Sequence, residues 1–248
     1  MPQDADLAAL RRVVRQLEEG GRETARVCPL GIAAVDAALP GGGLALGQLH
    51  QVVAGPGAFE GPATAFAAWM AARLARGRGP VVWCVQGGED DTLYAPGLAA
   101  LGLEPGRLMV ARARDPARLL WSLEEALHCP EVGAVIGQGA RLEGTSGRRL
   151  HLAAARRGVP GVLLERARRG GAPGVASTRW RLEGLPSAPT PWGGPGPARW
   201  RVVLERCRGG VPRAWILEWC DEAGTLDLVA DADHRSPDPA RATGGSVA

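Results

Sequence analysis

The chain has 248 residues, a formal net charge of +3, 46% apolar residues, 36 glycines and 20 prolines. This length fits one large domain, or one domain with appendages, and it supplies a core that needs no disulfides or metal to hold it together. Fibrous, coiled-coil and small disulfide-rich proteins are excluded by the composition, and a charge of +3 is too small to identify a nucleic-acid-binding protein by itself.

The basic residues are unusual because all 29 of them are arginines. Without a lysine, Schiff-base chemistry is excluded, and so is the standard phosphate-binding loop, whose lysine pairs with the outer phosphates. The five cysteines form no CxxC pair and the four histidines are scattered, so we expect reduced thiols and no metal site. The sequence indicates neither a signal peptide nor a membrane helix, and we expect a cytoplasmic protein.

The first predicted element is an amphipathic helix over 4–19, followed by a linker up to residue 27. Its apolar face is formed by four residues at 3-4-3 spacing, namely Leu7, Leu10, Val14 and Leu17. Such a helix either docks on its own domain or lies in a groove of a partner.

Strands and helices then alternate up to residue 164. Runs of apolar β-formers predict strands over 48–54, 81–85, 108–111, 132–136 and 159–164. Helical spacing of apolar residues predicts a short helix near Val35 and longer helices over 63–76, 93–101, 116–128 and 146–157. This alternation predicts an α/β fold with a mainly parallel sheet flanked by helices.

The pattern changes after residue 165. Two runs of β-formers, 200–207 and 212–219, are joined by a glycine turn, which predicts a β-hairpin within a C-terminal β extension that starts near residue 178. We therefore divide the chain into an N-terminal helix and linker (1–27), a core with its β extension (28–230) and a flexible tail (231–248).

The segment GPGAFEGPAT lies between a predicted strand and a predicted helix, which is the place of a phosphate-binding loop. Its two outer glycines are six positions apart instead of five, a proline replaces the lysine, the next residue has no hydroxyl, and Glu60 adds a negative charge. This degenerate nucleotide loop comprises Gly55, Gly57, Gly61, Pro62, Ala63 and Thr64.

The magnesium ligand of a nucleotide hydrolase is missing as well. The strand predicted over 132–136 continues into Gly137 and Gln138, where an aspartate would hold Mg²⁺. We therefore expect no catalytic residue, no bound cofactor and no ATP hydrolysis, while weak binding of a nucleotide by backbone amides stays open.

Four segments in this order resemble the ImuA family, the RecA-like accessory proteins of inducible mutagenesis. They are PLGIAAVDAALPGGGLALGQLHQVVAG, LYAPGLAALGLEPGRLMV, SGRRLHLAAARRGVPGVLL and TRWRLEGLPSAPTPW, and the likeness covers roughly residues 28–230. The resemblance implies a RecA-like core and a non-catalytic role in SOS-induced translesion DNA synthesis. The implied partners are an ImuB-type Y-family polymerase homologue, RecA and, indirectly, a DnaE-type error-prone polymerase.

The resemblance also implies that loops after the later central strands face DNA. The candidate contacts to single-stranded DNA are Arg141, Arg148, Arg149, Arg166, Arg168, Arg169 and Arg179. A solvated basic rim is the alternative for these residues. Trp180, Trp192 and Trp200 either stack on bases or fill the core of the β extension. In RecA-type filaments an N-terminal helix packs on the neighbouring subunit, which is a role that the helix over 4–19 can share.

Three other functions remain open at this point. A single-stranded-DNA-binding module would use the same arginines. An active RecA/KaiC-type ATPase is disfavoured by the missing lysine, and no sequence feature supports a SulA-like inhibitor of cell division.

Overall fold

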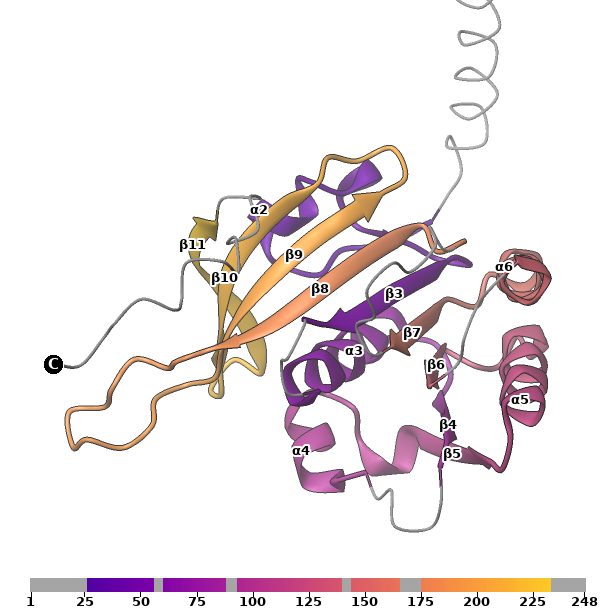
Figure 1. The fold of residues 1–248 in the computed structure, drawn as a ribbon, viewed down its shortest axis with the longest axis horizontal. Helices are drawn as coiled ribbons and strands as arrows, with labels where there is room; N and C mark the ends of the chain where they lie inside the picture. The colour runs from indigo at the N-terminus through magenta and orange to yellow at the C-terminus, as the bar shows by residue number, and fades with distance from the viewer. Residues whose placement is uncertain (1–25, 56–59, 88–92, 140–143, 166–174, 233–248) are drawn as a thin grey trace, which may run out of the picture.

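The structure is a computed structural model that describes residues 26–55, 60–87, 93–139, 144–165 and 175–232. Most of its strands belong to one nine-stranded sheet with the order β11-β10-β9-β8-β3-β7-β6-β4-β5 (Figure 1). A small antiparallel pair of β1 (Val27–Cys28) and β2 (Leu44–Ala45) lies beside it. None of the described helices is long and apolar enough to cross a membrane.

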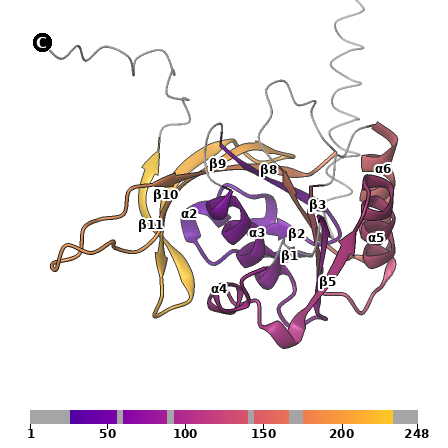
Figure 2. The same ribbon diagram turned by 60° about the horizontal axis from the view of Figure 1, so that its bottom comes forward.

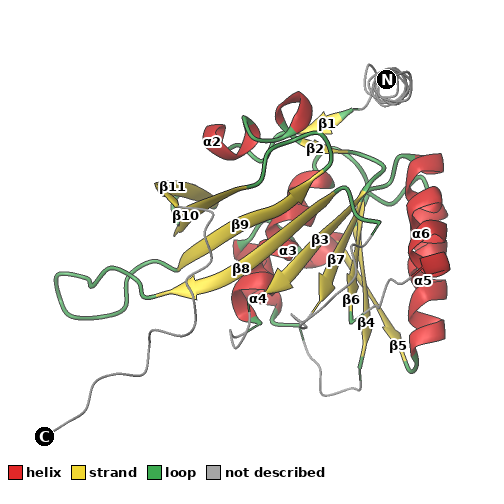
Figure 3. Ribbon diagram, turned by 45° about the horizontal axis from the view of Figure 1, so that its top comes forward, coloured by secondary structure: helices red, strands yellow, loops and turns green. Residues whose placement is uncertain are grey.

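One half of the large sheet is parallel. Its strands are β3 (Leu49–Ala54), β4 (Val81–Gln86), β5 (Leu108–Ala113), β6 (Ala134–Gln138) and β7 (Gly161–Glu165). On one face lies α3 (Gly61–Leu74), and on the other lie α5 (Pro116–His128) and α6 (Gly144–Arg157), as Figure 3 shows. The predicted α/β fold with a mainly parallel sheet between helices is therefore confirmed.

Local chemistry explains where these helices form. In α5, Asp115 accepts a hydrogen bond from the amide of Arg118 at 2.8 Å, and Pro116 follows in the first turn, where its missing N–H costs nothing. Leu119, Leu123 and Leu127 then recur at every fourth position and are buried against the sheet.

Short helical segments complete the connections. They are α2 (Ala33–Asp36), η1 (Pro40–Gly42), α4 (Ala95–Ala100) and η2 (Pro105–Arg107). The helix expected near Val35 is α2, and the carboxylate of Asp36 anchors its start by accepting from the amides of Leu30 and Gly31 at 2.7 and 2.9 Å.

The other half of the sheet is antiparallel. It contains β8 (Thr178–Leu185), β9 (Arg199–Cys207), β10 (Arg213–Cys220) and β11 (Thr225–Ala232). The predicted hairpin is β9 and β10, but β8 also pairs in parallel with β3, so these strands continue the central sheet. We did not predict β11, in which only three of the eight residues are large and apolar; of these, Leu226 is buried, and Leu228 and Val229 are exposed.

The largest part of the core lies around α3. Figure 2 shows that the strands from β8 to β11 arch over this helix, so it is covered on more than one side. Phe66 and Trp180 lie with ring centroids 5.7 Å apart, and Trp180 lies 6.3 Å from Trp215. Trp180 and Trp200 are both buried here. Of the two roles that the sequence left open for these two tryptophans, the structure supports packing in the core.

Candidate functional site

A cavity of about 340 Å³ opens where the central parallel strands end. Ligands of open α/β sheets bind at this edge, outside the carboxyl ends of the strands. The lining residues come from the ends of β3, β4, β6 and β7 and from the start of α3, and they include Glu60, Gln86, Gln138 and Glu165. This is the place that the sequence predicted for the degenerate nucleotide loop.

The first residue of the loop, Gly55, lies against β8. The amide of Gly55 donates to the carbonyl oxygen of Leu182 at 2.7 Å, and a Cβ atom at Gly55 would lie only 2.5 Å from Cγ of Glu183. A larger residue at position 55 would therefore displace the side chain of Glu183, because Gly55 lies directly against the neighbouring strand. Gly57 lies outside the described residues.

The start of α3 supplies few amides to the cavity. The helix begins at Gly61, Pro62 has no N–H, and the amide of Thr64 is already used in the first turn, where it donates to the carbonyl oxygen of Glu60 at 2.9 Å. Ala63 is buried and lines the cavity with a methyl group. Of the described residues of the degenerate loop, Ala63 therefore lines the cavity, and its side chain contributes no polar atom to the wall.

The end of β6 shows which of Gly137 and Gln138 occupies the place where an aspartate would hold Mg²⁺. Gln138 lines the cavity, and its amide oxygen accepts a hydrogen bond from Nε1 of Trp83 at 2.9 Å. Gly137 points to the other face, where a Cβ atom would lie 2.9 Å from a methyl carbon of Leu123. Sequence reasoning missed the contact with Trp83, because the two side chains come from neighbouring strands that are far apart in the chain.

The described residues that line the cavity carry acidic and amide side chains. They contribute the two carboxylates of Glu60 and Glu165 and the two neutral amides of Gln86 and Gln138, and they include no arginine. The described part of the chain also contains no group of three histidine, cysteine or acidic side chains that could hold a metal ion.

The candidate DNA contacts are only partly described. Arg141, Arg166, Arg168 and Arg169 lie outside the described residues, as do the four apolar residues of the predicted N-terminal helix, Leu7, Leu10, Val14 and Leu17. Arg148 is exposed on α6, and Arg149 forms an ion pair with Glu124 of α5. Arg179 is on β8, so the described candidates are divided between a helix and a strand.

The arginines of β8 and β9 are used within the sheet. Nε of Arg179 lies 2.9 Å from a carboxylate oxygen of Glu205, and its Nη1 donates to Gln51 at 2.6 Å. Arg181 pairs with the same Glu205 at 2.7 Å and with Glu183. Cross-strand pairing therefore balances the positive charge that the sequence shows in this segment.

Trp192 differs from the other two candidate tryptophans, because 85% of its surface is exposed. It lies in the middle of the long connection between β8 and β9, and this connection projects from the body of the molecule in Figure 1. This connection is held by a bridge between Pro189 and Pro195 and by a hydrogen bond of 2.9 Å from the hydroxyl of Thr190 to the carbonyl oxygen of Gly194.

No family model matches the sequence. The chain is similar to Protein ImuA of Caulobacter vibrioides, in the NA1000 and CB 15 strains, with 42% identity over 223 residues that cover 84% of this chain and 89% of the relative. The crystal structure of the RadB recombinase matches with a TM-score of 0.56 and 18% identity, over 82% of this chain and 99% of RadB. The likeness to RadB shows a RecA-like fold alone.

Proposed function

Because the chain belongs to the ImuA family, we propose that it is a non-catalytic adaptor in SOS-induced, error-prone translesion DNA synthesis in the cytoplasm. In this role it binds an ImuB-type Y-family polymerase homologue and RecA, and through the homologue it serves a DnaE-type polymerase. The RecA-like core then acts as a scaffold for protein contacts and has no cycle of ATP hydrolysis.

The composition of the cavity at the strand ends is the observation that carries this proposal. A magnesium–triphosphate complex needs cationic groups around its phosphates and a carboxylate on the metal. Here the described lining residues include no cationic side chain, and the residue at the end of β6 is Gln138, whose neutral amide oxygen already accepts a hydrogen bond from Trp83. These residues do not fit a magnesium-bound nucleotide.

The projecting connection between β8 and β9 supports a contact with a protein. An exposed tryptophan buries a large apolar area when a partner covers it, and tryptophans are frequent among the residues that dominate binding energy. Because Trp192 sits on a connection that already has internal hydrogen bonds, binding orders fewer residues and costs less entropy. We therefore assign Trp192 as an anchor for the polymerase homologue.

The adaptor role is tested by capturing the ImuB-type homologue on the immobilised full chain, in lysate treated with nuclease. We expect the complex to survive nuclease, to weaken about tenfold or more in Trp192→Ala, and to be unchanged in Trp121→Ala. Trp121 is the matched control because it is 62% exposed on α5, on a different part of the molecule. Loss of the complex after nuclease would identify DNA as the bridge and favour a single-stranded-DNA-binding module. Equal binding by both variants would contradict the role of Trp192.

The proposed loss of nucleotide binding is tested separately by titrating a fluorescent ATP analogue with and without Mg²⁺. We expect no saturable binding tighter than about 1 mM. Micromolar binding that depends on Mg²⁺ would refute the scaffold model and return the chain to the RecA/KaiC-type ATPases.

A further inference from the structure

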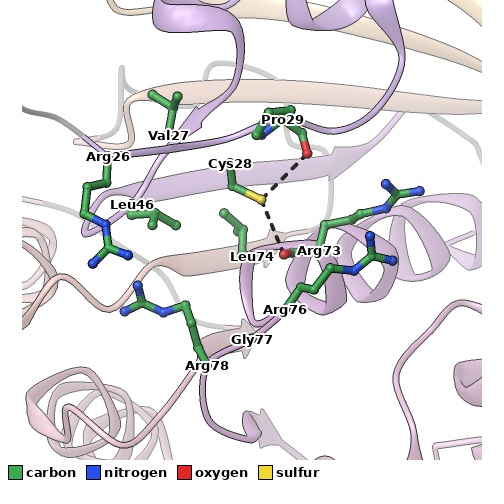
Figure 4. Close-up of a pocket in the computed structure, with 10 residues that line it drawn as sticks. All are labelled: Arg26, Val27, Cys28, Pro29, Leu46, Arg73, Leu74, Arg76, Gly77 and Arg78. Carbon is green, nitrogen blue, oxygen red and sulfur yellow. Dashed lines mark hydrogen bonds between the residues drawn. The ribbon is translucent and has the colours of Figure 1, made fainter.

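A second cavity, of about 360 Å³, lies at the other end of α3. Since α3 has 14 residues, about 20 Å of helix separates this cavity from the one at the strand ends. Four arginines line it, namely Arg26 before β1, Arg73 near the end of α3, and Arg76 and Arg78 in the turn that follows. We call this cavity the arginine pocket (Figure 4).

The four guanidinium groups form two pairs. In Figure 4, those of Arg26 and Arg78 point toward one another on one side, and those of Arg73 and Arg76 lie together on the other. Arg73 donates to the hydroxyl of Thr225 at 2.9 Å, and Arg78 donates to the carbonyl oxygen of Gly158 at 2.9 Å. Both partners are uncharged, so these contacts position the guanidinium groups without neutralising them.

Two further observations indicate that the positive charge is not balanced within the described structure. Nε of Arg78 is buried and has no hydrogen-bond partner. Burial lowers the pKa of Arg73, and the nearby charge of Arg76 lowers it further. Asp36 is the acidic residue whose charge acts on Arg73, but its carboxylate accepts from two backbone amides.

Capping of the helix does not explain the cluster. Arginines near the last turn of a helix interact favourably with its carbonyl groups. Here that role belongs to Arg107 of η2, which donates to the carbonyl oxygens of Ala75 at 3.1 Å and Gly79 at 2.9 Å. The arginines of the pocket therefore do not serve as the cap of α3, and Arg26 and Arg76 are exposed at the pocket, where an external anion can reach them.

The space between the two pairs of arginines is apolar. Leu46, Leu74 and Cys28 lie there in Figure 4, and Cys28 donates its thiol hydrogen to the carbonyl oxygen of Arg73 at 3.3 Å. Burial raises the pKa of this thiol and outweighs the opposing effect of the arginines, so the sulfur stays neutral. A ligand that fits this pocket has an apolar group in the middle and negative charge on both sides.

We propose that the arginine pocket binds an acidic peptide segment of a protein partner, with an apolar side chain between carboxylates. Each carboxylate can form paired hydrogen bonds with a guanidinium group, and the apolar side chain covers the leucines. A nucleic-acid backbone fits less well, because it has no apolar group for this floor and follows extended basic surfaces. The inference does not depend on the proposed function, since any partner with such a segment meets the same pocket.

Fluorescence anisotropy with the full chain tests the proposal. The probe is a labelled ten-residue peptide in which a leucine and a phenylalanine are each flanked by aspartate and glutamate, and the control peptide carries asparagine and glutamine instead. We expect the acidic peptide to bind at least about tenfold more tightly than the neutral one, with an affinity that falls as salt increases. Equal binding of the two peptides, or binding of neither, would overturn the proposal.

Variants of the pocket give the second arm of the test. Arg26→Glu combined with Arg76→Glu should weaken the acidic peptide about tenfold or more, because both side chains are exposed and face the pocket. The control is Arg148→Glu, an exposed arginine on α6, which should leave affinity unchanged. Thermal melting checks that each variant is folded. Unchanged affinity in the double variant, or displacement of the peptide by oligothymidylate at equal concentration, would show that the pocket is not a peptide site.

Discussion

His50 gives the chain a defined dependence of stability on pH. It lies on β3 and is fully buried, with Nε2 at 3.0 Å from the carbonyl oxygen of Ala45 and Nδ1 at 2.9 Å from the hydroxyl of Thr178. Because a carbonyl only accepts, Nε2 carries the proton and Nδ1 accepts from Thr178. The same hydroxyl oxygen accepts from Nε1 of Trp180 at 2.8 Å. Both ring nitrogens of His50, the hydroxyl of Thr178 and the indole nitrogen of Trp180 thus have hydrogen-bond partners while His50 is neutral.

Protonation of His50 breaks this arrangement and charges a buried ring. Burial lowers its pKa from 6.5 to about 4, against the smaller opposing effect of the hydrogen bond to Ala45. Between these two values the unfolded chain binds a proton that the folded chain does not, so the free energy of unfolding decreases as the pH falls from 6.5 to 4. At about 1.4 kcal/mol per pH unit, the gap corresponds to about 3 kcal/mol.

Urea denaturation of the wild-type chain and of His50→Gln, from about pH 7.5 down to pH 4, measures this contribution. Glutamine does not titrate, so its curve should lack the part of the pH dependence that belongs to His50, while the carboxylates contribute equally to both proteins. We expect the difference in the free energy of unfolding between the wild-type protein and His50→Gln to decrease by about 3 kcal/mol from pH 7.5 to pH 4. Curves that stay parallel within about 0.5 kcal/mol would refute the assignment of His50 as a buried neutral group.

Three further predictions test the packing of the core. Gly79→Ala should destabilise the fold by more than 1 kcal/mol, because its Cβ would lie 1.5 Å from the carbonyl oxygen of Glu131. The control is Gly61→Ala, which has open space around it and should leave the melting temperature nearly unchanged. Equal melting temperatures of the two variants would contradict the close contact at Gly79. Trp215→Ala should cost about 3–5 kcal/mol in urea denaturation, and a loss below about 1 kcal/mol would contradict its place in the core. Burial raises the pKa of Cys84 to about 12, so mass spectrometry should find it unmodified by iodoacetamide in the folded protein at about pH 8 and modified after unfolding.

Most helices and strands of the parallel half follow from local patterns. The apolar run before Gln86 predicted a strand buried on both faces, and the strand indeed has five fully buried residues in succession. The spacing of Leu119, Leu123 and Leu127 predicted α5 with its observed ends. These signals lie within a few residues of one another, so the sequence is enough to detect them. The edge strand β11 was not predicted, because it contains few large apolar residues and buries only one of them, Leu226.

The sequence placed Glu60, Ala63 and Gln138 near the ends of predicted elements, whereas the contributions of Gln86 and Glu165 to the cavity appeared only in the structure. The direction of single side chains was not predictable. A shift of one residue along a strand moves a side chain to the opposite face, so only the register of β6 shows that Gln138, and not Gly137, faces the cavity. Likewise, only the pairing of β8 with β9 shows that Glu205 forms ion pairs with Arg179 and Arg181.

The amino-acid sequence by itself determined that this protein has no lysine for a standard phosphate-binding loop and that Pro62 stands at the lysine position. Only the tertiary structure decided which groups meet. It brings Arg26 to the turn after α3, about fifty positions away, and it buries Trp180 while leaving Trp192 exposed. The physical reason is that burial and charge pairing depend on contacts between distant segments, whereas propensity and spacing act within one turn or one strand.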